Sequence, residues 1–178
     1  LFIYDRDWAI YEKGDHVIYE DHRNKFEFDK FIHHPSYQIE NLGIAIAAVA
    51  QLSIINIGNF LNEGLHNKTE IVGRFQRIEN KKINKITANN VEIIYDGGHN
   101  ESAALEVSKS IEKLDKKPLC IILGMISSKS PRNFISKFNH IECIKTINIP
   151  DEENTIPAED LKNMISEYCK SVEVSLSI

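Results

Sequence analysis

From residue 74 onward the sequence alternates between short apolar runs and longer segments with helical periodicity, and this alternation constrains the fold most. The short runs are rich in β-branched residues, which is typical of buried strands. Strands that alternate with helices form parallel βαβ units, so we expect an α/β fold with a mostly parallel, open three-layer sheet. The predicted order is strand 74–79, strand 91–95, helix 101–114, strand 118–124, helix 130–138, strand 141–148, helix 157–168 and strand 171–176.

The first 70 residues follow a different pattern. The runs WAIYEKG, DHVIYED and KFEFDKFI are aromatic and β-branched, and they are separated by Gly, Asp and Asn, so we expect three small antiparallel strands. In QIENLGIAIAAVAQLSII, residues 38–55, apolar positions fall all round, which predicts a helix buried on most faces. We expect a shorter helix at 59–65 and a polar linker at 67–73.

Composition narrows the class of protein. The chain of 178 residues has a formal net charge of -5 and scattered basic residues, so nucleic acid is not expected as a partner. Three cysteines, none in a Cys-x-x-Cys pair, favour a reducing cytoplasm over a disulfide framework. The apolar run LGIAIAAVA is too short to span a membrane. Because the sequence begins with Leu1 and not methionine, we expect a piece of a longer protein.

The run YDGGHN follows a predicted strand and precedes a predicted helix. Function in open α/β sheets gathers at the carboxyl ends of strands. The free amides at a helix start stabilise an anion, and Gly97 and Gly98 let a ligand approach the backbone. Asp96 could accept hydrogen bonds from ribose hydroxyls, and His99 could donate to a carboxylate. The alternative is a plain turn in which Asn100 caps the helix and the other polar side chains are solvated.

Other polar residues offer weaker indications. Arg74 and Arg77 follow the predicted linker, and a guanidinium binds phosphate oxygens bidentately, although a surface arginine is the simpler interpretation. Asn41 could hydrogen-bond an adenine edge or merely cap its helix. No metal site is predicted, because the histidines lack ligand spacing with any cysteine or carboxylate cluster; those concerned are His16, His22, His33, His34, His66 and His140.

Several motifs are absent from the sequence. It contains no G-x-x-x-x-G-K-[ST] loop, no G-x-G-x-x-G fingerprint and no serine nucleophile elbow. This stretch of chain therefore carries no phosphate cradle of its own.

A set of ordered motifs resembles one family. The motifs are HPSYQIENLGIAIAAVAQL, VGRFQRI, IIYDGGHNESAALEVSKSIEKL, and CIILGMISSKS followed by TINIPDEENTIPAEDL. In order and spacing they are similar to the folylpolyglutamate synthase/dihydrofolate synthase family, a branch of the Mur ligase superfamily. The similarity runs from about Phe2 to the end. Its most specific elements are Gly73–Arg74 and the run Asp96–Asn100, which is close to the family's usual Asp-Gly-Ala-His-Asn.

The resemblance implies a fold and an activity. Residues 1–70 would be the carboxyl-terminal part of the central ATP-binding domain. Residues 71–178 would be the Rossmann-like carboxyl-terminal domain, with a mostly parallel sheet whose last strand is missing. The implied reaction is ATP-dependent ligation of L-glutamate to a folate or dihydropteroate carboxylate through an acyl phosphate. The phosphate loop and the Mg²⁺ ligands would lie upstream, so this chain would be inactive alone, and the full-length bacterial enzyme would be a cytoplasmic monomer.

The resemblance also assigns roles to five residues. Asn41 would contact the adenine of ATP, and Arg74 would reach the phosphates. Asp96 would hold the nucleotide across an interdomain cleft, which closes about the 67–73 linker. His99 would help to receive glutamate, and His99 and Lys129 are the expected catalytic residues.

The sequence departs from the family in two places. The usual Gly-Met-x-x-Asp-Lys-Asp reads GMISSKS, with Ser128 and Ser130 in place of aspartates. The insert ENKKINKITANN looks longer than usual and suggests a hairpin extension. Two alternatives stay open: a Mur ligase of peptidoglycan precursors, against which DGGHN argues, and a non-catalytic remnant of a split gene.

Overall fold

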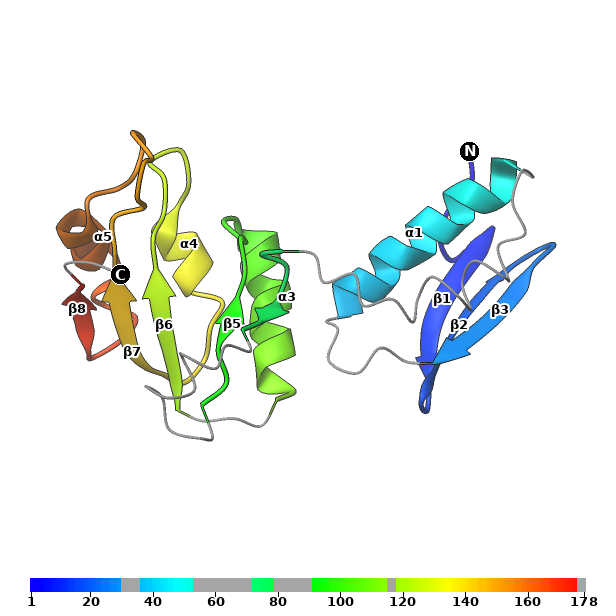
Figure 1. Ribbon diagram of the computed structural model, residues 1–178, viewed down its shortest axis with the longest axis horizontal. Helices are drawn as coiled ribbons and strands as arrows, with labels where there is room; N and C mark the ends of the chain where they lie inside the picture. The colour runs from blue at the N-terminus through cyan, green and yellow to red at the C-terminus, as the bar shows by residue number, and fades with distance from the viewer. Residues whose placement is uncertain (30–35, 53–71, 79–90, 115–117, 176–178) are drawn as a thin grey trace. The chain divides into compact units, whose positions relative to one another are not determined.

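The computed structural model describes residues 1–29, 36–52, 72–78, 91–114 and 118–175 (Figure 1). The predicted helix at 59–65, the insert at 79–90 and most of the predicted linker lie outside these residues. The chain forms two compact units, Leu1–Tyr95 and Asp96–Ile178, and each is described by itself. The domain boundary at residues 70 and 71 stays a prediction.

The first unit contains the predicted antiparallel sheet. Strands β1 (Trp8–Lys13), β2 (His16–Asp21) and β3 (Lys25–Asp29) pair in the order β1-β2-β3. Helix α1 (Ser36–Leu52) packs on β1 and β2. Their shared core is aromatic and aliphatic, and its buried members are Trp8, Ile10, Val17, Tyr19, Phe28, Ile39, Ile46 and Ala47. The prediction of three small antiparallel strands is therefore confirmed.

Asp21 holds the turn between β2 and β3. Its carboxylate accepts hydrogen bonds from the backbone amides of Arg23 (2.7 Å) and Asn24 (2.8 Å) and from the hydroxyl of Tyr19 (3.0 Å). Burial raises the pKa of the Asp21 carboxyl, but these hydrogen bonds outweigh burial and keep the pKa below its usual value. The side chain replaces the backbone partners that the turn lacks, which is why an aspartate suits this position.

Helix α1 buries one face and not most of its surface. Ile39 and Ile46 are buried, whereas Ile44 is 57% exposed and Leu52 is 60% exposed. The prediction of a helix buried on most faces was therefore wrong for this structure. The physical reason is that the described part of the unit offers α1 a single sheet to pack on, so its second apolar face has no described neighbour.

Gly43 sits where α1 crosses β1. A Cβ atom at this position would lie 2.5 Å from Cγ2 of Ile10 and 2.8 Å from Cζ3 of Trp8. We expect Gly43→Ala to lower the free energy of unfolding by about 1–3 kcal/mol, because overpacking of the core outweighs the better helix propensity of alanine. Denaturant unfolding, followed by the fluorescence of Trp8, measures the change.

The double variant Gly43→Ala/Ile10→Ala is the control for that clash. Removing Cγ2 of Ile10 takes away the closest atom, so the two changes together should cost less than the sum of the single changes. Strictly additive costs would show that the helix does not approach the sheet as closely as described.

The second unit has the predicted parallel α/β arrangement. Its described elements are α3 (Glu101–Glu112), β6 (Leu119–Leu123), α4 (Pro131–Ile135), β7 (Ile141–Thr146), α5 (Ala158–Ile165) and β8 (Val172–Val174). The strands pair in parallel in the order β6-β7-β8 (Figure 1). All three helices contribute to one core with the sheet; its buried members are Ala104, Leu123, Met125, Phe134, Ile135, Ile144, Ile156, Leu161, Ile165 and Cys169.

Only one face of the parallel sheet is covered within the described residues. Leu123 and Ile144 turn toward the helices and are buried, whereas Ile122 and Lys145 on the opposite face are exposed. The described part of this unit thus has two layers, and the predicted third layer is not seen in it. None of the described helices combines the length and the apolarity that a membrane span requires.

The two strands predicted before α3 differ from expectation. β4 (Gln76–Arg77) and β5 (Ile94–Tyr95) have two residues each and pair antiparallel with one another in a separate sheet. Gly73 and Phe75 have positive φ angles of 71° and 49°, so extended backbone begins only at Gln76. The prediction of long strands within the parallel sheet was wrong here, because these turn conformations shorten β4.

Candidate functional site

In the first unit, the start of α1 contacts the segment that carries Arg74. The side-chain amide of Gln38 donates to the backbone oxygen of Arg74 at 3.0 Å, and the amide of Gly73 donates to Oε1 of Gln76 at 3.2 Å. Asn41 lies three residues after Gln38, which places both on one side of the helix. Because α1 begins at Ser36, Asn41 is inside the helix, and the interpretation of Asn41 as a helix cap was wrong.

Arg74 is exposed between two backbone positions of positive φ. Its guanidinium Nη1 lies 3.5 Å from the oxygen of Gly73, at the limit of a hydrogen bond. The next residue, Phe75, is 5% exposed and has a φ of 49°, a conformation that costs energy for a bulky side chain. Burial of Phe75 therefore fixes the turn and leaves the guanidinium at the surface.

Arg77 differs from Arg74 in its surroundings. Its Nη1 atom lies 2.8 Å from Oε1 of Glu92, and both side chains are largely buried. This ion pair links β4 to the segment just before β5, next to the paired residues Arg77 and Ile94. Of the two arginines considered from sequence, Arg77 has a structural partner, and Arg74 is the better candidate for a ligand.

In the second unit, Asp96 folds back onto the turn that follows β5. Its Oδ1 accepts a hydrogen bond of 2.6 Å from the amide of Gly98, and the residue is half-buried. A Cβ atom at position 98 would lie 2.7 Å from this oxygen and 3.1 Å from Cβ of Ala103. Glycine at position 98 therefore permits this orientation of the carboxylate, which an alanine there would displace.

The two residues after the glycines have different roles: Asn100 caps a helix, and His99 exposes its imidazole. Asn100 is the N-cap of α3, and its Oδ1 accepts from the amide of Ala103 at 2.9 Å, so the capping interpretation is confirmed for this residue. His99 is exposed, and its Nδ1 lies 3.0 Å from the oxygen of Gly97. A carbonyl partner requires a proton on Nδ1, which makes Nε2 of the neutral ring an acceptor.

Lys129 lies in the loop that follows β6, and a second loop is joined to this one. The amide of Ser127 donates to the oxygen of Asn154 at 2.9 Å, the amide of Ile156 donates to the oxygen of Met125 at 2.8 Å, and Ile126 forms an antiparallel bridge with Thr155. The second loop, which contains residues 154–156, was not predicted to lie beside Lys129. Its position at the carboxyl end of a predicted strand was the available signal.

Ser130, which stands where the resemblance predicts an aspartate, has a structural role. It is the N-cap of α4, with Oγ 3.5 Å from the amide of Asn133, and Pro131 occupies the first turn. Serine and aspartate are both good N-caps. The local structure therefore explains why either residue type is suitable at this position.

We expect Ser130→Ala to lower the free energy of unfolding by about 0.5–1 kcal/mol, because the amide of Asn133 loses its side-chain acceptor. Ser130→Asp is the matched control and should retain wild-type stability. Thermal and denaturant unfolding measure both variants. Equal losses in the alanine and aspartate variants would contradict the capping role.

The described parts of the two units bring the predicted residues together only in part. Asn41 and Arg74 belong to the first unit, Asp96 and His99 share one turn of the second, and Lys129 lies in the β6–α4 loop. Among the described residues, no group of three or more His, Cys, Asp or Glu side chains is arranged to hold a metal ion.

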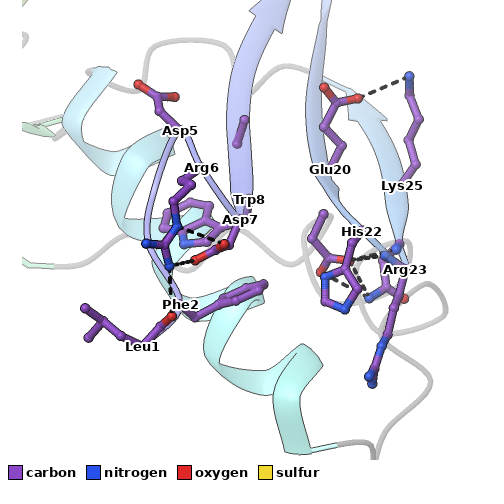
Figure 2. Close-up of a pocket in the computed structure, with 13 residues that line it drawn as sticks. Leu1, Phe2, Asp5, Arg6, Asp7, Trp8, Glu20, His22, Arg23 and Lys25 are labelled. Atoms are coloured by element: carbon purple, nitrogen blue, oxygen red, sulfur yellow. Dashed lines mark hydrogen bonds and ion pairs between the residues drawn. The ribbon is translucent and has the colours of Figure 1, made fainter.

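The first unit also has an open hollow beside β1 and the β2–β3 turn (Figure 2). Two ion pairs lie in its wall: Arg6 contacts Asp7 at 2.7 Å, and Lys25 lies 3.4 Å from Glu20. None of the five predicted site residues lines it. Acidic and basic side chains are mixed in its lining, so the hollow does not select for a ligand of one charge.

Comparison with known proteins gives a fold. No protein-family model matches the chain, and no curated protein matches it. Among solved structures, Thermotoga maritima folylpolyglutamate synthase is 24% identical with a TM-score of 0.74, and the match covers 98% of this chain and 40% of that one. Escherichia coli FolC in complex with ADP is 17% identical with a TM-score of 0.77, covering 98% and 38%.

A third similar structure is the bifunctional folylpolyglutamate synthase/dihydrofolate synthase of Yersinia pestis with AMPPNP and Mn. It is 15% identical, with a TM-score of 0.78, and the match covers 98% of this chain and 38% of that one. The chain therefore spans about two-fifths of the length of the structures it matches. The similarity confirms the expected α/β fold.

Proposed function

We propose that this chain is the carboxyl-terminal part of an ATP-dependent ligase of the folylpolyglutamate synthase/dihydrofolate synthase family. The ligase would join L-glutamate to a carboxylate of folate or dihydropteroate. One observation carries the proposal: the Asp96–Asn100 turn places a half-buried carboxylate and an exposed imidazole immediately before a capped helix, on a fold shared with FolC solved in complex with DHPP and ADP.

The reaction proceeds in two steps. A substrate carboxylate attacks the γ-phosphate of ATP, ADP leaves, and the amine of glutamate then displaces phosphate from the acyl phosphate. Magnesium, when bound, would neutralise phosphate charge, and its ligands would belong to the part of the ligase that this chain does not span. In the first unit, the exposed guanidinium of Arg74 would offset the charge that develops on the transferred phosphoryl group, and the exposed amide of Asn41 would hydrogen-bond the adenine.

The second unit would supply groups for the nucleotide and for glutamate. The carboxylate of Asp96 can accept hydrogen bonds from ribose hydroxyls while it is held by the amide of Gly98. In the tautomer with its proton on Nδ1, His99 would offer Nε2 as an acceptor for the ammonium group of incoming glutamate. Lys129 would attract a substrate carboxylate from the loop after β6.

A chimaeric enzyme tests the proposal. Residues 1–178 would replace the matching portion of T. maritima folylpolyglutamate synthase, and incorporation of labelled glutamate into dihydropteroate and dihydrofolate would be measured beside binding of ADP. Glutamate incorporation is the expected result. A folded chimaera that binds ADP but ligates neither substrate would instead favour the non-catalytic remnant, which the replacement of two family aspartates by Ser128 and Ser130 keeps as the second candidate.

A further inference from the structure

Two of the three cysteines lie side by side on neighbouring strands. Cys120 of β6 and Cys143 of β7 are register partners in the parallel sheet. Neighbouring strands are about 4.7–4.9 Å apart, which lies within the Cα separation of about 4.4–6.8 Å that a disulfide needs. Because partners in register project to the same side of a sheet, both thiols share one face.

That face is open to solvent in the described structure. Cys120 is exposed and Cys143 is partly exposed, and Ile122 beside them is 67% exposed. The third cysteine has a different environment, since Cys169 is buried in the core and its Sγ lies 3.5 Å from the oxygen of Glu142. A dissolved oxidant can therefore reach Cys120 first.

A bulge lies next to the pair. The register passes from Leu119–Ile141 directly to Cys120–Cys143, so Glu142 is an extra residue in β7. A bulge bends its strand and increases the local twist, which changes the direction in which neighbouring side chains point. The pKa of the Cys143 thiol is raised to about 11, first by a hydrogen bond with Cys120 and then by burial. The register pairing and the raised pKa of Cys143 together indicate that the two thiols are neighbours on the sheet.

We propose that Cys120 and Cys143 form a redox-active dithiol that closes reversibly to a disulfide. The oxidant is a low-molecular-weight disulfide. The Cys120 thiolate attacks one of its sulfurs, which forms a mixed disulfide and releases the first small thiolate. Cys143, after losing its proton to solvent, attacks Sγ of Cys120 and releases the second. Two protein thiols are oxidised and one small disulfide is reduced to two thiols.

The position of the pair decides what the disulfide would do. Cys120 is exposed, and exposed disulfides are among the readily reduced ones. Cys120 lies three residues before the end of β6, whereas Lys129 follows that end. The link would therefore stabilise the sheet against unfolding without reaching the loop after β6, and it does not depend on the ligase chemistry.

Oxidised glutathione is the probe. The native chain is incubated with it, free thiols are alkylated, and peptides are mapped by mass spectrometry without reduction. We expect a Cys120–Cys143 peptide, a fall from three alkylatable thiols to one, and a thermal midpoint higher by roughly 5 °C. Dithiothreitol should reverse all three. Three persistent thiols, or a link that includes Cys169, would overturn the proposal.

Three serine variants separate the steps. Cys143→Ser should accumulate glutathione on Cys120, because the resolving thiol is gone, and Cys120→Ser should acquire neither modification. Cys169→Ser should behave like the native chain, with circular dichroism confirming that it folds. If the native chain retains as much glutathione on Cys120 as Cys143→Ser does, Cys143 does not resolve the mixed disulfide and the dithiol is excluded.

Discussion

Replacing Arg74 with alanine in a complete ligase that contains this chain is expected to lower kcat for glutamate ligation by about 10²–10³-fold, the typical loss for one group that stabilises transition-state charge. Gln38 holds the backbone of Arg74 beside α1, and the exposed guanidinium has no ion-pair partner among the residues that the structure describes. Removing it should leave the fold intact, because the anchor of this turn is the buried Phe75. Steady-state kinetics and ADP affinity, measured together, check both statements.

Two variants sharpen this prediction. Arg74→Lys keeps the charge but loses the planar fork, so it should restore only part of the activity. Arg77→Ala breaks the ion pair with Glu92, so it should lower stability while leaving kcat of the folded fraction within a few-fold of wild type. Equal losses of kcat in the Arg74 and Arg77 alanine variants would show that Arg74 has no special role in ligation.

Leu161→Ala is expected to cost about 2–5 kcal/mol in the free energy of unfolding, the range for removing a large buried aliphatic side chain. Leu161 is 0% exposed and belongs to the core of the second unit, between α5 and the parallel sheet. A loss of this size is a large fraction of the total free energy of unfolding of a small unit. Denaturant unfolding, followed by far-ultraviolet circular dichroism, should show the second unit unfolding first.

Met164→Ala is the matched control on the same helix. Met164 is 39% exposed, so its truncation removes fewer packing contacts and should cost less than about 1 kcal/mol. If both variants lose the same amount, the burial of α5 described here is wrong.

The sequence predicted those elements whose local pattern agrees with their packing. The three antiparallel strands of the first unit and the alternating strands and helices after Glu101 were predicted correctly, because each has a clear apolar period bounded by turn residues. Helix α1 was predicted with the wrong burial, since an apolar composition reports what a helix can bury and not what is available to cover it. The length of strand β4 was overestimated because nothing in VGRFQRI reveals the positive φ of Phe75.

The candidate site was predictable as separate motifs. The turn after β5 was found because glycine, aspartate and histidine are unusual together before a helix. Asn41 remained ambiguous between a cap and a ligand until the structure placed the helix start at Ser36. The attachment of residues 154–156 to the loop of Lys129 depends on backbone hydrogen bonds between distant segments, which carry no side-chain signature. Roles for Asn41, Arg74, Asp96, His99 and Lys129 stay predictions.

The interlocking of the two loops after β6 and β7 has an evolutionary consequence. Because Met125, Ile126 and Ser127 are joined through their backbones to Asn154, Thr155 and Ile156, neither loop can gain or lose a residue at these points without misaligning the other. Insertions and deletions in related chains should therefore avoid both contact segments or occur in compensating pairs. Within the loop after β7, variation of length is expected in residues 150–153, which precede the contact segment.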